Sequence, residues 1–88
     1  MNVRYFAAAR AAAGLEEERF DLAPGATVAD LLETVLSVQR PEAPAGTPPL
    51  PRILSRSSFL LNEVAVRDHG VVLKADDVVD VLPPFAGG

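Results

Sequence analysis

The chain has 88 residues, with 8 Lys and Arg against 12 Asp and Glu, and a formal net charge of −4. This acidic balance argues against a nucleic-acid-binding protein, which needs a basic face, and it favours a protein partner with a basic surface. Cysteine is absent, which excludes disulfides and thiolate metal sites.

Hydrophobic residues make up 49% of the chain, enough for one small packed core. No run is long and apolar enough to span a membrane, and the first residues lack the charged and apolar regions of a secretion signal. We therefore expect one domain over residues 1–88, located in the cytoplasm, with neither a membrane nor a nucleic acid as its partner.

The first predicted strand covers residues 3–7, with Val3 and Tyr5 on one side and Arg4 and Phe6 on the other. Phe6 could instead simply pack under a loop. The alanine-rich residues 7–13, with Arg10 in the middle, are expected to form a short helical turn that stops at Gly14.

A second, half-exposed strand is predicted within residues 15–22, because Phe20 and Leu22 alternate with charged residues. The acidic residues 16–18 are expected to be a solvated edge that discourages pairing with another sheet. Pro24 and Gly25 follow as a turn.

The clearest helix of the sequence starts after Thr27. Thr27 and Asp30 have the spacing of a capping box, with Asp in place of the preferred Glu. Apolar residues then recur every three or four positions, as one stripe facing a sheet. They are Val28, Leu31, Leu32, Val35 and Leu36. The helix should end near residues 39–40, before Pro41.

Residues 41–51 are rich in proline and are predicted to form neither a helix nor a central strand. An ordinary long connection is the main interpretation, with residues 51–54 docking it on the core. A ligand for a proline-binding domain is the alternative. Ser55, Ser57 and Ser58 are placed in the same loop, without a neighbouring base.

The second half of the chain reads as strands over 58–62, 64–66 and 77–82, with a turn at Asn62 and Glu63. Asp76 and Asp77, in the turn before the last strand, are expected to be solvated. Asp80 is taken to mark the exposed face of that strand. This order predicts an α+β fold, in which one main helix packs on one face of a mixed sheet of four to five strands.

If the first and last strands are neighbours, Phe6 and Leu82 form an exposed apolar patch on the face away from the helix. The tail, residues 83–88, leaves the body beside this patch. Pro83 and Pro84 stop the strand, since proline cannot donate to a sheet, and they favour a stiff, extended backbone.

Gly87 and Gly88 end the sequence after Phe85 and Ala86. A frayed end is the plain interpretation of such a tail. The alternative is functional: glycines without a Cβ fit a narrow channel, and the Gly88 carboxylate is open to chemical activation. The sequence offers no phosphate-binding loop, no cysteine nucleophile and one isolated histidine, His69. We therefore expect no bound cofactor, no metal and no catalysis by the chain alone.

These features together resemble the MoaD/ThiS family of ubiquitin-like sulfur carriers, which have the β-grasp fold, and most closely its MoaD-like members. The resemblance covers nearly the whole chain apart from residues 41–57, and the Pro-Pro-x-x-Gly-Gly ending is its most specific motif. Asp76 departs from the family, which often has glycine in this turn. The proline-rich segment is longer than usual.

The resemblance implies a sulfur carrier for the synthesis of the molybdenum cofactor. An ATP-dependent, MoeB-like enzyme would adenylate Gly88, and the adenylate would be converted to a thiocarboxylate. The carrier would then dock on a MoaE-like large subunit, in a heterotetramer, and pass its sulfur to a cyclic pterin phosphate. The resemblance assigns the contact to residues around the tail, namely Phe6, Arg10, Leu82, Pro83, Pro84, Phe85 and Ala86, with Gly87 and Gly88 carrying the reactive end.

Three alternatives stay open. A sulfur carrier for thiazole or cysteine synthesis would share Gly87 and Gly88 but use another partner. A protein modifier would be attached to lysines through Gly88. A plain binding module would have an inert tail.

Overall fold

The computed structural model describes residues 1–84, and within them five strands form one mixed sheet in the order β2-β1-β5-β3-β4. The strands are β1 (Asn2–Tyr5), β2 (Glu17–Arg19), β3 (Ser58–Leu61), β4 (Val64–Ala65) and β5 (Val78–Leu82). β1 and β5 are parallel, and the other neighbouring strands are antiparallel. The predicted α+β class and the predicted neighbourhood of the first and last strands are therefore confirmed.

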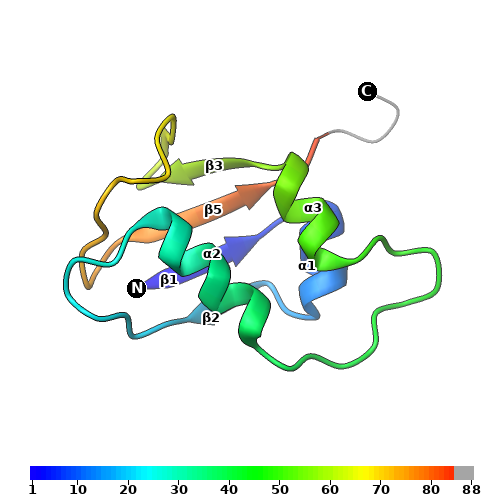
Figure 1. The fold of residues 1–88 in the computed structure, drawn as a ribbon. Coiled ribbons are helices and arrows are strands. Elements are labelled where there is room, and N and C mark those ends of the chain that lie inside the picture. The colour runs from blue at the N-terminus through cyan, green and yellow to red at the C-terminus, as the bar shows by residue number, and fades with distance from the viewer. Residues whose placement is uncertain (85–88) are drawn as a thin grey trace.

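The helices of the described residues lie together against one face of this sheet (Figure 1). They are α1 (Ala7–Ala13), α2 (Val28–Ser37) and α3 (Leu50–Arg56). Val79 and Val81 of β5 are fully buried beneath the helices. Leu31 and Val35 of α2 are fully buried in the same core. Each such side chain contributes about 1.5–3 kcal/mol to the stability of the fold. None of these helices is long and apolar enough to cross a membrane.

The predicted capping box of α2 is confirmed. The Asp30 backbone N–H donates to Thr27 Oγ1 at 3.2 Å, and the Thr27 N–H donates to Asp30 Oδ2 at 2.9 Å. The apolar stripe is confirmed at Leu31 and Val35, but it is wrong at Leu36, which is 44% exposed. The helix also ends earlier than predicted, at Ser37.

The helix α3 corrects the prediction that residues 41–51 form only a loop. Leu50, Ile53 and Leu54 are buried at helical spacing, and that burial stabilises the helix despite the prolines around its start. Proline is tolerated there because the first N–H groups of a helix have no partner within it. Since Leu50 and Pro51 belong to α3 and Leu50 is buried, these two residues are not part of an extended proline-rich ligand.

Of the three serines assigned to a loop, Ser55 is placed differently, and Ser58 starts the strand predicted over 58–62. Ser55 lies in α3, and its hydroxyl donates to the carbonyl oxygen of Arg52. Ser57 follows the helix, with its hydroxyl donating to the carbonyl of Ile53. Ser58 begins β3. Each of the three therefore has a structural position at the junction of α3 and the sheet.

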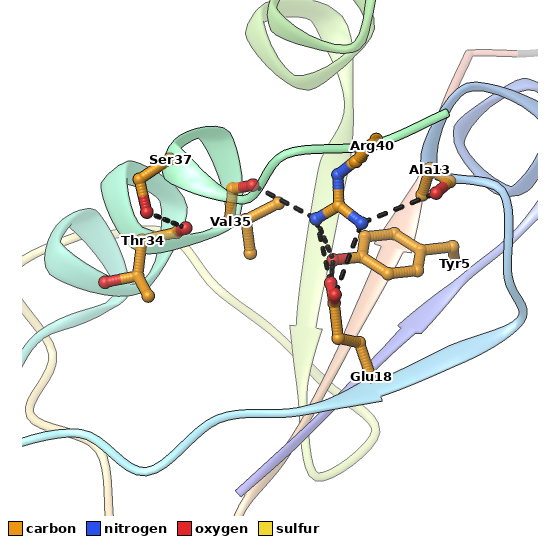
Figure 2. A network of polar contacts seen from close by, with 7 residues as sticks. All are labelled: Tyr5, Ala13, Glu18, Thr34, Val35, Ser37 and Arg40. Atoms are coloured by element: carbon orange, nitrogen blue, oxygen red, sulfur yellow. Dashed lines mark hydrogen bonds and ion pairs between the residues drawn. The ribbon is translucent and has the colours of Figure 1, made fainter. Parts of the chain in front are cut away.

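The strand β2 is shorter than predicted, and its glutamates are not all solvated. Only Glu17–Arg19 pair with β1, and Phe20 lies buried beyond the end of the strand. Glu18 pairs with Val3, so its side chain points to the helix side of the sheet. There it meets the side chain of Arg40, for which the sequence analysis predicted no role (Figure 2).

Arg40 connects the helices to the sheet through its guanidinium group (Figure 2). Nη2 donates to Glu18 Oε1 at 2.8 Å and to the Val35 carbonyl oxygen at 3.0 Å, near the end of α2. Nη1 donates to the carbonyl oxygen of Ala13, the last residue of α1, at 3.4 Å. The Tyr5 hydroxyl donates to Glu18 at 2.8 Å, and burial together with this bond raises the pKa of Tyr5.

Arg40→Ala should lower the free energy of unfolding by about 3 kcal/mol, because it leaves the carboxylate of Glu18, whose side chain is only 16% exposed, without its cation. The measurement is urea-induced unfolding. The control is Arg19→Ala, whose ion pair with Asp21 is 3.6 Å long between exposed side chains and should contribute less than about 0.5 kcal/mol. Equal losses in the two variants would contradict this role of Arg40.

The two turns before β4 and β5 are joined by Asp77, which is buried rather than solvated as predicted. Asn62 and Glu63 both have positive φ, as the predicted hairpin turn requires. Asn62 Nδ2 donates to Asp77 Oδ1 at 2.9 Å, and the Lys74 N–H donates to Asp77 Oδ2 at 2.7 Å. The neighbouring Asp76 does not have positive φ, so this turn does not require the glycine common in the family.

Burial opposes the ionisation of Asp77, but the hydrogen bonds from Asn62 and Lys74 outweigh it and hold its pKa below the ordinary value of 3.8. The folded state therefore binds the Asp77 proton less readily than the unfolded state. The resulting stability is present above pH 3.8 and is lost as the pH falls through the lowered pKa.

The free energy of unfolding should thus fall less steeply with acid in Asp77→Asn than in the original chain. Urea-induced unfolding at a series of pH values between neutral and strongly acidic measures this slope. Asp76→Asn, in the exposed neighbour, is the matched control and should leave the slope unchanged. An unchanged slope in Asp77→Asn would refute the linkage.

Candidate functional site

The sequence analysis predicted the functional site at the end of the last strand, β5, where the chain leaves the body. β5 lies in the middle of the sheet, between β1 and β3, so its last residue is held from both sides. Leu82 pairs with Ser58 of β3. Pro83 is half-buried and Pro84 is exposed. The central strand therefore directs the chain outward from a fixed point on the body.

Phe6 lies at the same end of the sheet as Leu82. Tyr5 and Val81 are the last paired residues of the parallel strands, and Phe6 and Leu82 follow them directly in the chain. Phe6 is 41% exposed and marks the start of α1. The predicted apolar patch beside the tail is therefore present, on the side of the sheet that the helices leave open.

One residue of this patch was missed by the sequence analysis. Leu60 pairs with Asp80, so it lies on the open face while Phe59 points into the core. The alternation of β3 could have located Leu60, but only once its neighbour in the sheet was known. We call these exposed and half-buried residues the tail patch: Phe6, Leu60, Leu82, Pro83 and Pro84.

Asp80 corrects the expectation that it marks a solvated face. It does lie on the face away from the helices, but it is only 5% exposed. Arg4 Nε and Nη2 donate to its two carboxylate oxygens at 2.6 and 2.9 Å. This bidentate ion pair joins β1 to β5 next to the tail patch.

Arg10, the predicted rim residue, lies one helical turn after Phe6, since its N–H approaches the Phe6 carbonyl oxygen at 3.4 Å. Its Nη1 is 3.0 Å from Glu16 Oε1, between two exposed side chains. Arg4, Phe6 and Arg10 share the lining of a depression of about 400 Å³ with Glu16 and Glu17. The structure therefore brings Phe6, Arg10 and Leu82 to one end of the body.

Phe85, Ala86, Gly87 and Gly88 lie outside the described residues, so their assigned roles stay predictions. Within residues 1–84, no group of three or more His, Cys, Asp or Glu side chains is placed to hold a metal ion. His69 is exposed, and its ring meets the ring of Phe59 edge-on at 5.5 Å between centroids. The described body thus presents an exposed apolar patch where the tail begins.

The ThiS family model matches residues 3–88. The chain is also 35% identical to the molybdopterin synthase sulfur carrier subunit of Chlamydomonas reinhardtii, over 100% of this chain and 98% of that protein. The chain therefore belongs to the ThiS family, and the resemblance expected from its sequence is confirmed.

Solved structures agree with this assignment. SAMP1 from Haloferax volcanii is 25% identical, covers 99% of this chain and 97% of its own, and superposes with a TM-score of 0.77. A complex of subunits 1 and 2 of molybdopterin-converting factor from Helicobacter pylori matches with 23% identity, a TM-score of 0.61, and coverage of 99% and 96%. The latter likeness shows the fold alone. The predicted ubiquitin-like β-grasp fold is confirmed.

Proposed function

We propose that this protein is the sulfur carrier subunit of a molybdopterin synthase. The observation that carries the proposal is the full-length likeness to such a subunit, in a chain whose central strand leads directly into Pro83 and Pro84 beside an exposed apolar patch. In this role the folded body binds the partner proteins, and the reactive group is the carboxylate of Gly88.

The chemistry on that carboxylate needs a partner. A carboxylate is a poor acceptor for a nucleophile because its leaving group would be oxide. A MoeB-like enzyme attaches the AMP part of ATP to a Gly88 oxygen, with loss of pyrophosphate. A sulfide-level nucleophile from the sulfur source then forms a C–S bond to the Gly88 carbonyl carbon as the C–O bond to AMP breaks, which gives the thiocarboxylate. The thiocarboxylate then donates its sulfur to a cyclic pterin phosphate. The carrier itself is not a catalyst in this scheme.

The tail patch supplies the docking energy that the tail lacks. Ordering each tail residue costs about 1–2 kcal/mol, whereas burying Phe85 returns only about 2 kcal/mol. The rigid body adds Phe6, Leu60 and Leu82 to the contact without a further ordering cost. A MoaE-like large subunit is the proposed partner, in a heterotetramer. The H. pylori complex, in which a protein of this fold is bound to a second subunit, is consistent with that arrangement.

A second candidate function is protein modification, in which Gly88 is joined to lysines of other proteins. The likeness to SAMP1 favours it, since a second H. volcanii structure of this fold is described as a small archaeal modifier protein. The two functions share the activation of Gly88 and differ in its acceptor. Isopeptide-linked adducts in cells would support modification. A carrier for thiazole or cysteine synthesis would instead co-purify with an enzyme of that pathway.

Incubation of the full chain with a MoeB-like enzyme, ATP and a sulfur source should raise its intact mass by the difference between sulfur and oxygen. The chain without Gly88 should fold normally and show no change, because the five strands of the described sheet lie within residues 2–82. An unchanged mass of the full chain would contradict activation at Gly88, and unfolding of the shortened chain would contradict the separate roles of body and tail.

Phe6→Asp should weaken binding to a MoaE-like subunit roughly tenfold to a hundredfold, because it places a charge in the middle of an apolar contact. Isothermal titration measures the affinity, and circular dichroism confirms the fold. Val72→Asp is the matched control, since Val72 is 55% exposed and pairs with Thr27, away from the tail. Equal affinity of the two variants would remove Phe6 from the interface.

A further inference from the structure

Ala7 has a backbone conformation that is unusual for its residue type. Its φ is +50°, in the left-handed region, where the Cβ of alanine crowds the following carbonyl oxygen. The other non-glycine residues with positive φ among residues 1–84 are Asn62 and Glu63, which form the turn between β3 and β4. Glycine is the usual residue at such positions, and the chain has it at Gly14, Gly25 and Gly46.

The surroundings of Ala7 explain why the chain turns sharply at this point, directly between β1 and α1 (Figure 1). Tyr5, the last residue of β1, is paired with Val81 and is only 2% exposed. Ala9 is already fully buried, and its N–H donates to the Phe6 carbonyl oxygen at 3.0 Å. This bond closes a four-residue turn in which Ala7 is the second residue. The positive φ of Ala7 therefore belongs to the turn that joins the strand to the helix.

The helix α1 is also fixed at its other end. The Gly14 N–H donates to the Arg10 carbonyl oxygen at 2.9 Å, and Arg40 Nη1 donates to the Ala13 carbonyl oxygen at 3.4 Å. A helix of seven residues is too short to be stable alone, so its position depends on these contacts. Because both ends are held, α1 does not shift to relieve the strain at Ala7.

The methyl group of Ala7 gains no burial that would offset this strain. Ala7 is exposed, and it lines the depression that Arg4, Phe6 and Arg10 share. A glycine would adopt the same φ without strain, so neither the turn nor the core requires the Cβ. The Cβ does exclude many backbone conformations that are open to glycine. Strained residues of this kind are found mainly at functional sites.

We propose that Ala7 is a positioning residue for partner binding, whose Cβ restricts the turn to one conformation and so holds Phe6 outward in the tail patch. The inference rests on the proposed docking of a MoaE-like subunit at Phe6. Phe6 directly precedes Ala7, has an extended backbone with φ −123° and ψ 151°, and is 41% exposed. A partner that meets Phe6 in this orientation does not lose affinity to ordering it.

The first measurement is urea-induced unfolding of the full chain. Ala7→Gly should raise the folding equilibrium constant roughly twofold, because the relief of strain outweighs the greater freedom of glycine in the unfolded chain. Replacement of Ala7 by D-alanine, through chemical synthesis, should raise it roughly tenfold, since D-alanine favours positive φ and keeps a Cβ. Ala11→Gly is the matched control in the same helix. Ala11 is exposed and lacks positive φ, so this variant should lower the constant roughly fourfold.

The second measurement separates positioning from stability. Ala7→Gly should weaken binding to a MoaE-like subunit roughly fivefold although its fold is more stable, because binding must then order the turn. The chain with D-alanine should bind as tightly as the original. In the free chain, the ¹⁵N order parameters of residues 6 and 7 should fall below the rigid range of about 0.85 in Ala7→Gly alone.

Unchanged affinity or unchanged order parameters in Ala7→Gly would overturn the positioning role, as would a loss of stability with D-alanine. Weak binding of the D-alanine chain would also overturn it, because the partner would then contact the methyl group itself. Phe6→Asp distinguishes these failures from failure of the proposed function. If Phe6→Asp also binds normally, the docking surface is wrong. If it binds weakly while Ala7→Gly binds normally, only the role of Ala7 is wrong.

Discussion

The parallel pairing of β1 with β5 is the constraint on which the rest of the structure depends. Two parallel neighbours end at the same edge of a sheet, so Phe6, which follows Tyr5, and Leu82, which follows Val81, lie at the same edge. This pairing places Phe6 beside the tail although the two are separated by almost the whole sequence. The Arg4–Asp80 ion pair and the buried Val3, Val79 and Val81 hold the two strands in register.

The features that the sequence predicted are those encoded over short distances. The capping box at Thr27 and Asp30 spans three residues, the stop of α1 at Gly14 needs one positive φ, and the turn at Asn62 joins two adjacent strands. The tail patch was predicted for a different reason. Once the first and last strands were taken as neighbours, simple alternation assigned Phe6 and Leu82 to the same face.

The features that the sequence missed depend on partners far along the chain. From the sequence, Glu18 was predicted to belong to a solvated acidic edge. In the structure it pairs with Arg40, 22 residues later. Asp80 was predicted to be exposed, but in the structure it forms an ion pair with Arg4, 76 residues earlier. The helix α3 was not predicted, because its sequence contains prolines, which disfavour helices in general. Its burial against the core outweighs that local preference. Long-range pairing leaves no periodic pattern in a single sequence.

In the proposed function, the protein is a rigid body that presents a reactive chain end beside a docking surface. Hydrogen–deuterium exchange of the described body, alone and bound to a MoaE-like subunit, tests this most directly. Protection should appear in the segments around Phe6, Leu60 and Leu82, with no change in residues 71–77 at the far end. Protection confined to residues 71–77 would contradict the account, because the partner would then bind away from the tail.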